Sequence, residues 1–161
     1  MARDLRSACG RAASHNEPMP FDLERFVAAQ EGVYDGALRE LRHGRKTGHW
    51  IWFIFPQLVG LGRSEMSRLY GIESLEEARA YLEHPVLGPR LRECVSAVLA
   101  TSRATAEDIF GSIDARKVRS SMTLFHRAAP DEPLFMEVLK RFYGGVVDDA
   151  TDALLGGRGA S

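Results

Sequence analysis

Hydrophobic residues recur every three or four positions along most of the chain, which is the spacing of one face of an α-helix. The clearest stretch runs from Leu23 to Leu41, with Asp22 before it as a good N-cap and Gly44 after it as a helix stop. This pattern predicts one long amphipathic helix.

Residues that favour helix ends divide the rest of the chain into further helices. Ser64 can cap a short helix that ends at Gly71, and Ser74 with Glu77 forms the S-x-x-E capping box of a helix that Pro85 ends. Later helices are predicted to start at Pro89, Thr105, Asp114 and Pro133, with stops at Gly111 and at the Gly144-Gly145 pair, and a last turn to span residues 148–155. Because no stretch alternates apolar and polar residues between hairpin turns, we predict an all-α fold, a single compact orthogonal helical domain.

The segment from His49 to Gln57, HWIWFIFPQ, is apolar on every face, so its periodicity does not distinguish a strand from a helix. Among helices, a short buried helix starting near Thr47 is the simpler interpretation. The segment contains both tryptophans, Trp50 and Trp52, and rings of that size dominate the energetics of protein cores. We therefore predict a buried aromatic central segment, and both a purely structural role and a pocket-lining role remain open for it.

Composition excludes several classes of protein. The 161-residue chain is 45% hydrophobic and 27% charged, which is the balance of an ordinary globular protein. Its longest uninterrupted apolar run, Trp50 to Pro56, is too short to cross a bilayer as a helix. The 21 basic and 22 acidic residues give a net charge of -1, so we expect neither nucleic acid nor a membrane as a partner.

Cysteine usage points to a reducing environment. Cys9 and Cys94 are the two cysteines, and neither has the spacing of a zinc ligand set. We expect a cytoplasmic protein with no metal and no cofactor.

Three segments are expected along the chain. Residues 1–20 lack apolar periodicity and are predicted to be a mobile N-terminal tail. Residues 21–155 are predicted to form the helical domain, and the glycine-rich residues 156–161 a flexible C-terminal tail.

Long strings of residues, spread from Phe21 to Leu155, carry a family resemblance. They include Gln30-Glu31-x-x-Tyr34, Gly44-x-Lys46, His49-Trp50-x-Trp52-Phe53-x-Phe55-Pro56-Gln57, Tyr81-Leu82-x-His84-Pro85 and Ser120-Ser121-Met122-Thr123-Leu124-Phe125. Through these strings the chain resembles domain-of-unknown-function family 1810. The resemblance implies a mainly helical single domain and no particular reaction. Some members carry a calpastatin-like label, but the apolar patterning here argues against an extended, disordered inhibitor.

The first candidate site is a polar pair on the first predicted helix. Gln30 falls in the middle of the apolar stripe of that helix, with Tyr34 beside it. A buried amide without a partner costs about 1 to 3 kcal/mol. Gln30 therefore either bonds to backbone groups freed around Pro56, or lines a pocket with Tyr34 and hydrogen-bonds to a ligand.

The second candidate site surrounds the aromatic segment. Lys46 and His49 precede the segment, while Gln57 and several glycines follow it and lead to a helix N-terminus at Ser64. Free backbone N–H groups beside a lysine can bind an anion. Neither the P-loop nor the Rossmann glycine pattern is present, so ordinary loop glycines and a phosphate site both remain open.

The third candidate site lies on the helix predicted after Asp114. Lys117 and Ser121 are four residues apart and border its apolar stripe. A desolvated lysine can activate a hydroxyl, although a lysine at a core edge commonly extends toward water.

Two functions from different classes follow. The first function is the binding of an anionic, nucleotide-like small molecule, either by a binding protein or by an enzyme of unknown reaction. Its proposed polar contacts and stacking walls are Gln30, Tyr34, Lys46, His49, Trp50, Gln57, Lys117 and Ser121, of which His49, Lys117 and Ser121 are the best catalytic candidates. The alternative is a non-enzymatic protein-interaction module with a purely structural aromatic segment. Polar side chains converging on a pocket favour the first function, and an apolar outer patch favours the second.

Overall fold

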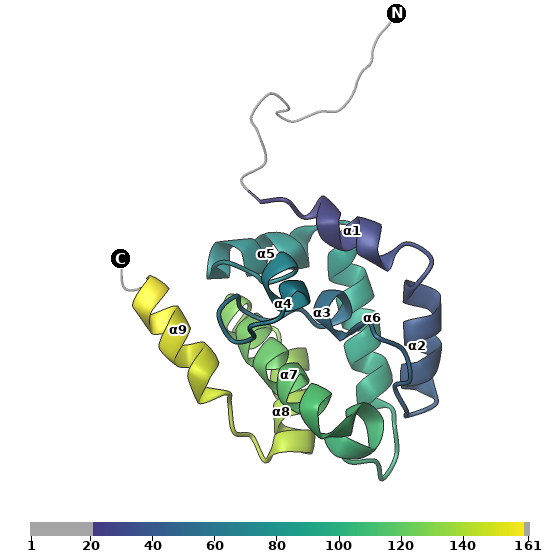
Figure 1. Cartoon of the computed structure of the whole chain (residues 1–161). Coiled ribbons are helices and arrows are strands. Elements are labelled where there is room, and N and C mark those ends of the chain that lie inside the picture. The colour runs from purple at the N-terminus through teal and green to yellow at the C-terminus, as the bar shows by residue number, and fades with distance from the viewer. Residues whose placement is uncertain (1–20, 160–161) are drawn as a thin grey trace, which may run out of the picture.

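The computed structural model describes residues 21–159. Within this range the chain forms helices and no named strand, which confirms the all-α prediction (Figure 1). The helices are α1 (Glu24–Gln30), α2 (Tyr34–Arg42), α3 (Ile51–Ile54), α4 (Glu65–Leu69), α5 (Leu75–Glu83), α6 (Leu87–Leu99), α7 (Ala106–Ala128), α8 (Leu134–Tyr143) and α9 (Asp149–Gly159). The predicted N-terminal tail, residues 1–20, lies outside the described residues.

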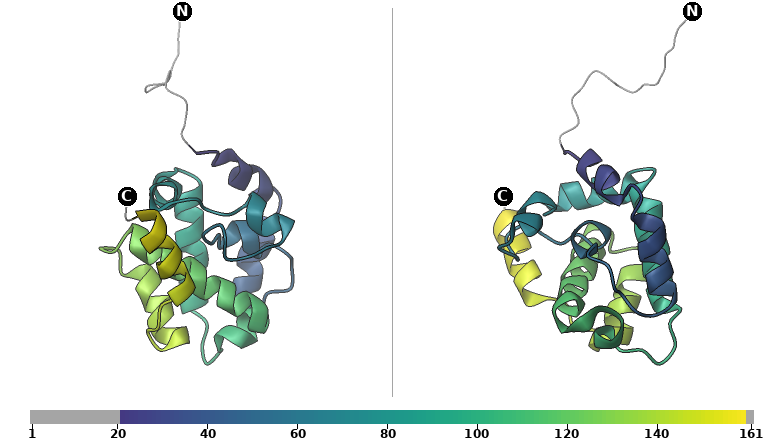
Figure 2. Two further views of the ribbon diagram at one scale, coloured as in Figure 1. Left: turned by 60° about the vertical axis from the view of Figure 1, so that its left-hand side comes forward. Right: turned by 45° about the vertical axis from the view of Figure 1, so that its right-hand side comes forward.

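The long helix α7 organises the domain. It packs against α5, α8 and α9, and α6 packs against α2, α5 and α8 (Figures 1 and 2). The short helix α3 contacts both α1 and α7, so the aromatic segment lies between the N-terminal helices and the longest helix. This single helical domain therefore encloses one core.

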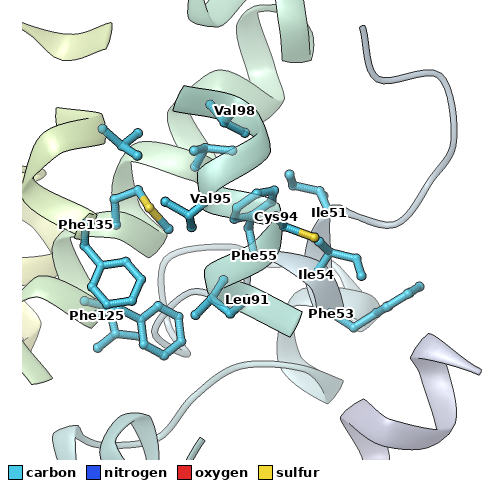
Figure 3. Packing of buried hydrophobic residues seen from close by; sticks show 14 of the residues in the cluster. Ile51, Phe53, Ile54, Phe55, Leu91, Cys94, Val95, Val98, Phe125 and Phe135 are labelled. Atoms are coloured by element: carbon cyan, nitrogen blue, oxygen red, sulfur yellow. The ribbon is translucent and has the colours of Figure 1, made fainter. Parts of the chain in front are cut away.

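Aromatic rings connect the parts of this core (Figure 3). Phe55 meets Phe110 edge-on with ring centres 5.8 Å apart, which joins the aromatic segment to the start of α7. Phe125 lies 5.4 Å from Tyr81 and 5.8 Å from Phe135, which joins α7 to α5 and α8. Such ring pairs contribute about 0.5 to 1.5 kcal/mol beyond the apolar area that they bury.

Local capping confirms three of the predicted helix starts. The hydroxyls of Ser64, Ser74 and Thr105 each accept a hydrogen bond from the backbone N–H three residues later. Asp108 also accepts from the backbone of Thr105 and completes a capping box. At the C-terminal end of α8, Gly144 adopts a left-handed conformation that ends the helix, as expected for glycine.

The predicted long helix from Leu23 to Leu41 is wrong in one respect. The first helix ends at Gln30 and the next begins at Tyr34, because Gly32 between them adopts a positive φ of 73°. The expected Asp22 cap is also wrong, since Leu23 occupies the N-cap position of α1 and provides no side-chain cap. Apolar spacing continues across the break, so periodicity alone did not reveal it.

The apolar side chains of the aromatic segment are buried, as predicted, with one exception. Trp50 and Phe53 to Pro56 are buried, whereas Trp52 on the same helix is partly exposed. Four residues make about one turn of helix, so one face of α3 must point away from the centre. Trp52 occupies that face.

The C-terminal helix continues beyond the predicted end of the domain. Helix α9 extends to Gly159, past Leu155 and into the segment expected to be a tail. Buried Thr151 and Leu155 hold the helix on the domain, and the helical conformation carries on through the glycines that follow.

Candidate functional site

The loop before α3 is held in place by Glu40 of α2. One carboxylate oxygen of Glu40 accepts hydrogen bonds from the backbone N–H of Thr47 and Gly48 and from Nε1 of Trp50, at 2.8 to 2.9 Å. Burial opposes ionisation, but these three donors lower the pKa of Glu40 to about 2. The loop is therefore fixed by an ionised carboxylate.

The same loop is fastened to α7. The backbone N–H of Lys46 donates to the carbonyl of Ile109 at 2.7 Å, just before Gly111 interrupts the helical backbone with φ 82° and ψ 163°. Because the kink separates two helical stretches, the carbonyl at the end of the first stretch needs a partner from elsewhere. Lys46 provides it, and its side chain then lies over the start of the second stretch.

Two lysines meet at Asp114. Nζ of Lys46 lies 2.8 Å from one carboxylate oxygen of Asp114, and Nζ of Lys117 lies 3.4 Å from the other. Lys46 also donates to the carbonyl of Gly48 and lies over the ring of Trp50, and only 8% of its side chain is exposed. Lys117 is more accessible, with 26% of its side chain exposed. The structure thus brings together two sequence-predicted residues through a carboxylate that had been singled out only as a helix start.

Trp52 of α3 and Lys117 of α7 are in contact with each other. The Lys117 ammonium lies 5.2 Å from the centre of the Trp52 ring, within the range of a cation–π interaction. Nε1 of Trp52 is buried and has no hydrogen-bond partner among the described residues. The sequence predicts Trp50 or Tyr34 as the stacking wall. Trp50 is buried and its indole N–H is bonded to Glu40, and Tyr34 lines neither of the two grooves beside this contact.

Two grooves lie on either side of this contact. We call the first the Trp52 groove: it encloses about 380 Å³ and is lined by residues that include Lys46, His49, Trp52, Phe110, Ile113 and Asp114. We call the second the Arg116 groove: it encloses about 270 Å³ and is lined by residues that include Gln57, Ile113, Arg116, Lys117, Ser120 and Asp148. They share Ile113, which is 63% exposed on the rim between them. The volume of the Trp52 groove falls at the lower end of the range of small-molecule sites, about 300 to 1,000 Å³, and that of the Arg116 groove just below it.

His49 and Gln57, both predicted as ligand contacts, line these grooves. His49 is exposed in the Trp52 groove and has no hydrogen-bond or ion-pair partner in the described part of the chain. Gln57 is partly exposed in the Arg116 groove, and its backbone carbonyl accepts from Ile72. Both side chains are available to a ligand.

Gln30 and Tyr34 lie elsewhere and have protein partners. The Gln30 amide donates to the carbonyl of Phe53 and to the Tyr81 hydroxyl, and accepts from Arg90. The Tyr34 hydroxyl donates to Glu93, and burial is the main cause that raises the pKa of Tyr34. Gln30 therefore serves the backbone of the aromatic segment, which was one of the two predicted alternatives.

Ser121 and Lys117 border the same helix face but form no hydrogen bond with each other. The Lys117 ammonium extends toward Asp114 and Trp52, whereas the Ser121 hydroxyl is fully buried and has no partner in the region that the structure covers. The arrangement does not assemble a lysine-activated hydroxyl.

The predicted anion site at the N-terminus of α4 is not built for one. This helix has five residues, and the Ser64 hydroxyl already accepts from the backbone N–H of Ser67. The polar groups accessible to a ligand line the two grooves instead. Arg116 was missed by sequence reasoning, because its position on α7 becomes informative only when the loop before α3 lies opposite.

The described residues contain no group of three or more His, Cys, Asp or Glu side chains placed to hold a metal ion. Across the same part of the chain, no helix combines the length and apolar character that a bilayer crossing requires.

Comparison with known proteins places this geometry in a family context. A family model described as a protein of unknown function, DUF1810, matches residues 20–155. The crystal structure of the conserved hypothetical protein Rv1873 from Mycobacterium tuberculosis is similar, with 54% sequence identity and a TM-score of 0.84, over 86% of this chain and 99% of that one. No curated protein matches the chain.

Proposed function

This chain belongs to the DUF1810 family, whose description assigns no activity, and we propose that it binds a small anionic ligand in the Trp52 and Arg116 grooves. The observation that carries the proposal is the position of Lys117. Its partly exposed ammonium lines the Arg116 groove and contacts both Trp52 and Asp114 of the Trp52 groove. A cation at the junction of two grooves can reach a ligand in either.

The charge balance around the grooves supports an anion. Lys46, Arg116 and Lys117 supply three positive charges, against two negative charges from Asp114 and Asp148. The negative charge of Asp148 is partly compensated by protein donors. One of its carboxylate oxygens accepts from the Ser120 hydroxyl and from the backbone N–H and hydroxyl of Thr151. The excess of positive charge favours a ligand of opposite sign.

The alternative of a protein-interaction module has less support. It requires a contiguous apolar patch on the surface. The large hydrophobic side chains that the described structure exposes are Leu69 on α4, Ile113 on α7 and Val146 in the loop between α8 and α9. One of them, Ile113, is the shared rim of the grooves.

A thermal-shift screen with nucleotides, NAD, ADP-ribose and sugar phosphates tests the proposal. A ligand at 100 times its Kd adds about 2.7 kcal/mol to stability, which raises the melting temperature measurably. For a compound that binds, Lys117→Met should weaken affinity about tenfold, because a charge-assisted hydrogen bond is lost. The matched control is Lys140→Met, which changes an exposed lysine on α8 that lines neither groove. Equal affinities of the two variants, or no stabilisation by any compound, would contradict the proposal.

A further inference from the structure

The two grooves differ in chemistry, and this difference bears on the class of ligand. The Trp52 groove is walled mainly by aromatic and aliphatic side chains, Ile51, Trp52, Phe110 and Ile113, with His49 and Ser112 among its polar groups. The neighbouring Arg116 groove is lined by the cationic and hydrogen-bonding side chains of α7, together with the carboxylate of Asp148 and the apolar Leu61, Ile113 and Ala150. The aromatic walls of the first groove suit a flat ring, and the cationic side chains of the second suit an anionic group.

Unpaired positive charge is concentrated in the Arg116 groove. The Arg116 guanidinium is exposed and has no ion-pair or hydrogen-bond partner among residues 21–159. Lys117 has a single ion pair, at 3.4 Å. By contrast, Lys46 in the Trp52 groove is nearly buried and committed to Asp114 at 2.8 Å. An incoming anion thus finds free donors at Arg116 and Lys117 rather than at Lys46.

Arginine is well suited to this role. Its planar guanidinium can donate two parallel hydrogen bonds to the oxygens of a phosphoryl group, and it stays charged at any physiological pH. The Gln57 amide, which has no side-chain hydrogen bond in the described structure, lines the same groove and adds a neutral donor.

We infer that the ligand is a phosphorylated compound with a planar ring, of the nucleoside monophosphate class. This inference rests on the proposed function. The phosphoryl group occupies the Arg116 groove, against Arg116 and Lys117, and the ring occupies the Trp52 groove, against Trp52 and Phe110. The linking sugar crosses the junction of the two grooves, and the ring packs against the side of Ile113 that lines the Trp52 groove. Ile113 is then a specificity-determining residue, because it contacts the ring-bearing part of the ligand and not the phosphoryl group.

Isothermal titration with three probes tests this arrangement: adenosine 5′-monophosphate, ribose 5-phosphate, and adenosine. The monophosphate should bind at least tenfold more tightly than either fragment, because it alone fills both grooves. Arg116→Ala should weaken the binding of the monophosphate and of ribose 5-phosphate about tenfold each. Ile113→Ser should weaken the monophosphate about fivefold and leave ribose 5-phosphate unchanged.

Matched controls are available because the changed side chains are exposed. Arg39→Ala removes an exposed arginine of α2, and Val146→Ser replaces an exposed aliphatic residue after α8; neither residue lines a groove. Both controls should bind all three probes like the unchanged protein. The inference is overturned if ribose 5-phosphate binds as tightly as the monophosphate, or if Ile113→Ser and Val146→Ser behave alike. In either case the proposal that the grooves bind an anion would remain valid. If no anionic probe binds, both that proposal and the inference about the ligand class are wrong.

Discussion

The ammonium of Lys46 lies 2.8 Å from a carboxylate oxygen of Asp114, and both side chains are largely withdrawn from water. This ion pair, together with the hydrogen bond from the Lys46 backbone to Ile109, holds the loop before α3 on α7. Lys46 therefore shapes the Trp52 groove as much as it lines it. The structure differs here from the sequence-based view of Lys46 as an accessible side-chain tip.

Breaking this pair should destabilise the protein. Lys46→Met leaves a partly buried carboxylate with one ammonium, and Asp114→Asn leaves a buried ammonium without its anion, so each should lower the free energy of unfolding by about 3 kcal/mol. The double variant should lose less than the sum of the two, because the second change removes the charge stranded by the first. Urea denaturation measures the free energy of unfolding of the unchanged protein, the two single variants and the double variant. As a control, Arg42→Met breaks an exposed pair with Glu93 and should cost less than about 1 kcal/mol. Additive effects at Lys46 and Asp114 would mean that the pair is not coupled.

Glu40 predicts a specific dependence of stability on pH. The pKa of this carboxyl is about 2 in the folded protein, below its ordinary value of 4.5. A depressed folded-state pKa gives stability that is fully present above the unfolded pKa and is lost as the pH falls toward the folded value. The stability difference between the unchanged protein and Glu40→Gln should thus be constant above about pH 5.5 and shrink between pH 4.5 and pH 2. Denaturant unfolding of both proteins across this pH range measures the difference in their free energies of unfolding. A difference that does not change with pH would contradict the lowered pKa of Glu40.

Gly111 should tolerate no side chain without a cost in stability. Its φ of 82° and ψ of 163° lie in a region that is essentially restricted to glycine, and no atom lies within 4 Å of the position of an added Cβ. Gly111→Ala should therefore cost about 1 to 3 kcal/mol through backbone strain alone. Gly156→Ala is the matched control, since it also meets no atom but lies in the helical backbone of α9, where alanine is favoured by about 1 kcal/mol. In thermal unfolding, the melting temperature should fall for Gly111→Ala and rise for Gly156→Ala.

Cys94 should be unreactive while the protein is folded. Burial raises the pKa of its thiol to about 12, so almost no thiolate is present near neutral pH. In a Cys9→Ser protein, a thiol reagent at pH 8 should modify Cys94 only at the rate at which the domain opens, and at once in denaturant. Rapid modification of the folded protein would show that the core around α6 is accessible.

Much of the secondary structure was predictable because it depends on residues close together in the chain. The caps at Ser64, Ser74 and Thr105 each act on an N–H three residues away. The stop at Gly144 depends on the conformation of one residue. The break at Gly32 is equally local but was missed, because a single glycine inside a helical pattern is compatible with either outcome.

The candidate site was only partly predictable. Lys46, His49 and Gln57 were identified from residue type and proximity to the aromatic segment, and Lys117 from its position at the border of an apolar helix stripe. The structure places all four along the paired grooves. The partners that give them meaning were not identified as such. Arg116 appeared as one more charged helix residue, and Asp114 as a helix start.

The sequence by itself determined where most helices begin and end and that an aromatic segment would be central, because propensity, capping and periodicity act within a few residues. Tertiary structure alone decided that Trp52 faces outward, that Gln30 bonds to Phe53, and that Lys46 and Lys117 share Asp114. Each of these facts depends on how a short, uniformly apolar helix is rotated and on which distant helix lies opposite. A segment that is apolar on every face carries no periodic signal to specify that rotation, so only the packing of α3 against α1 and α7 specifies it.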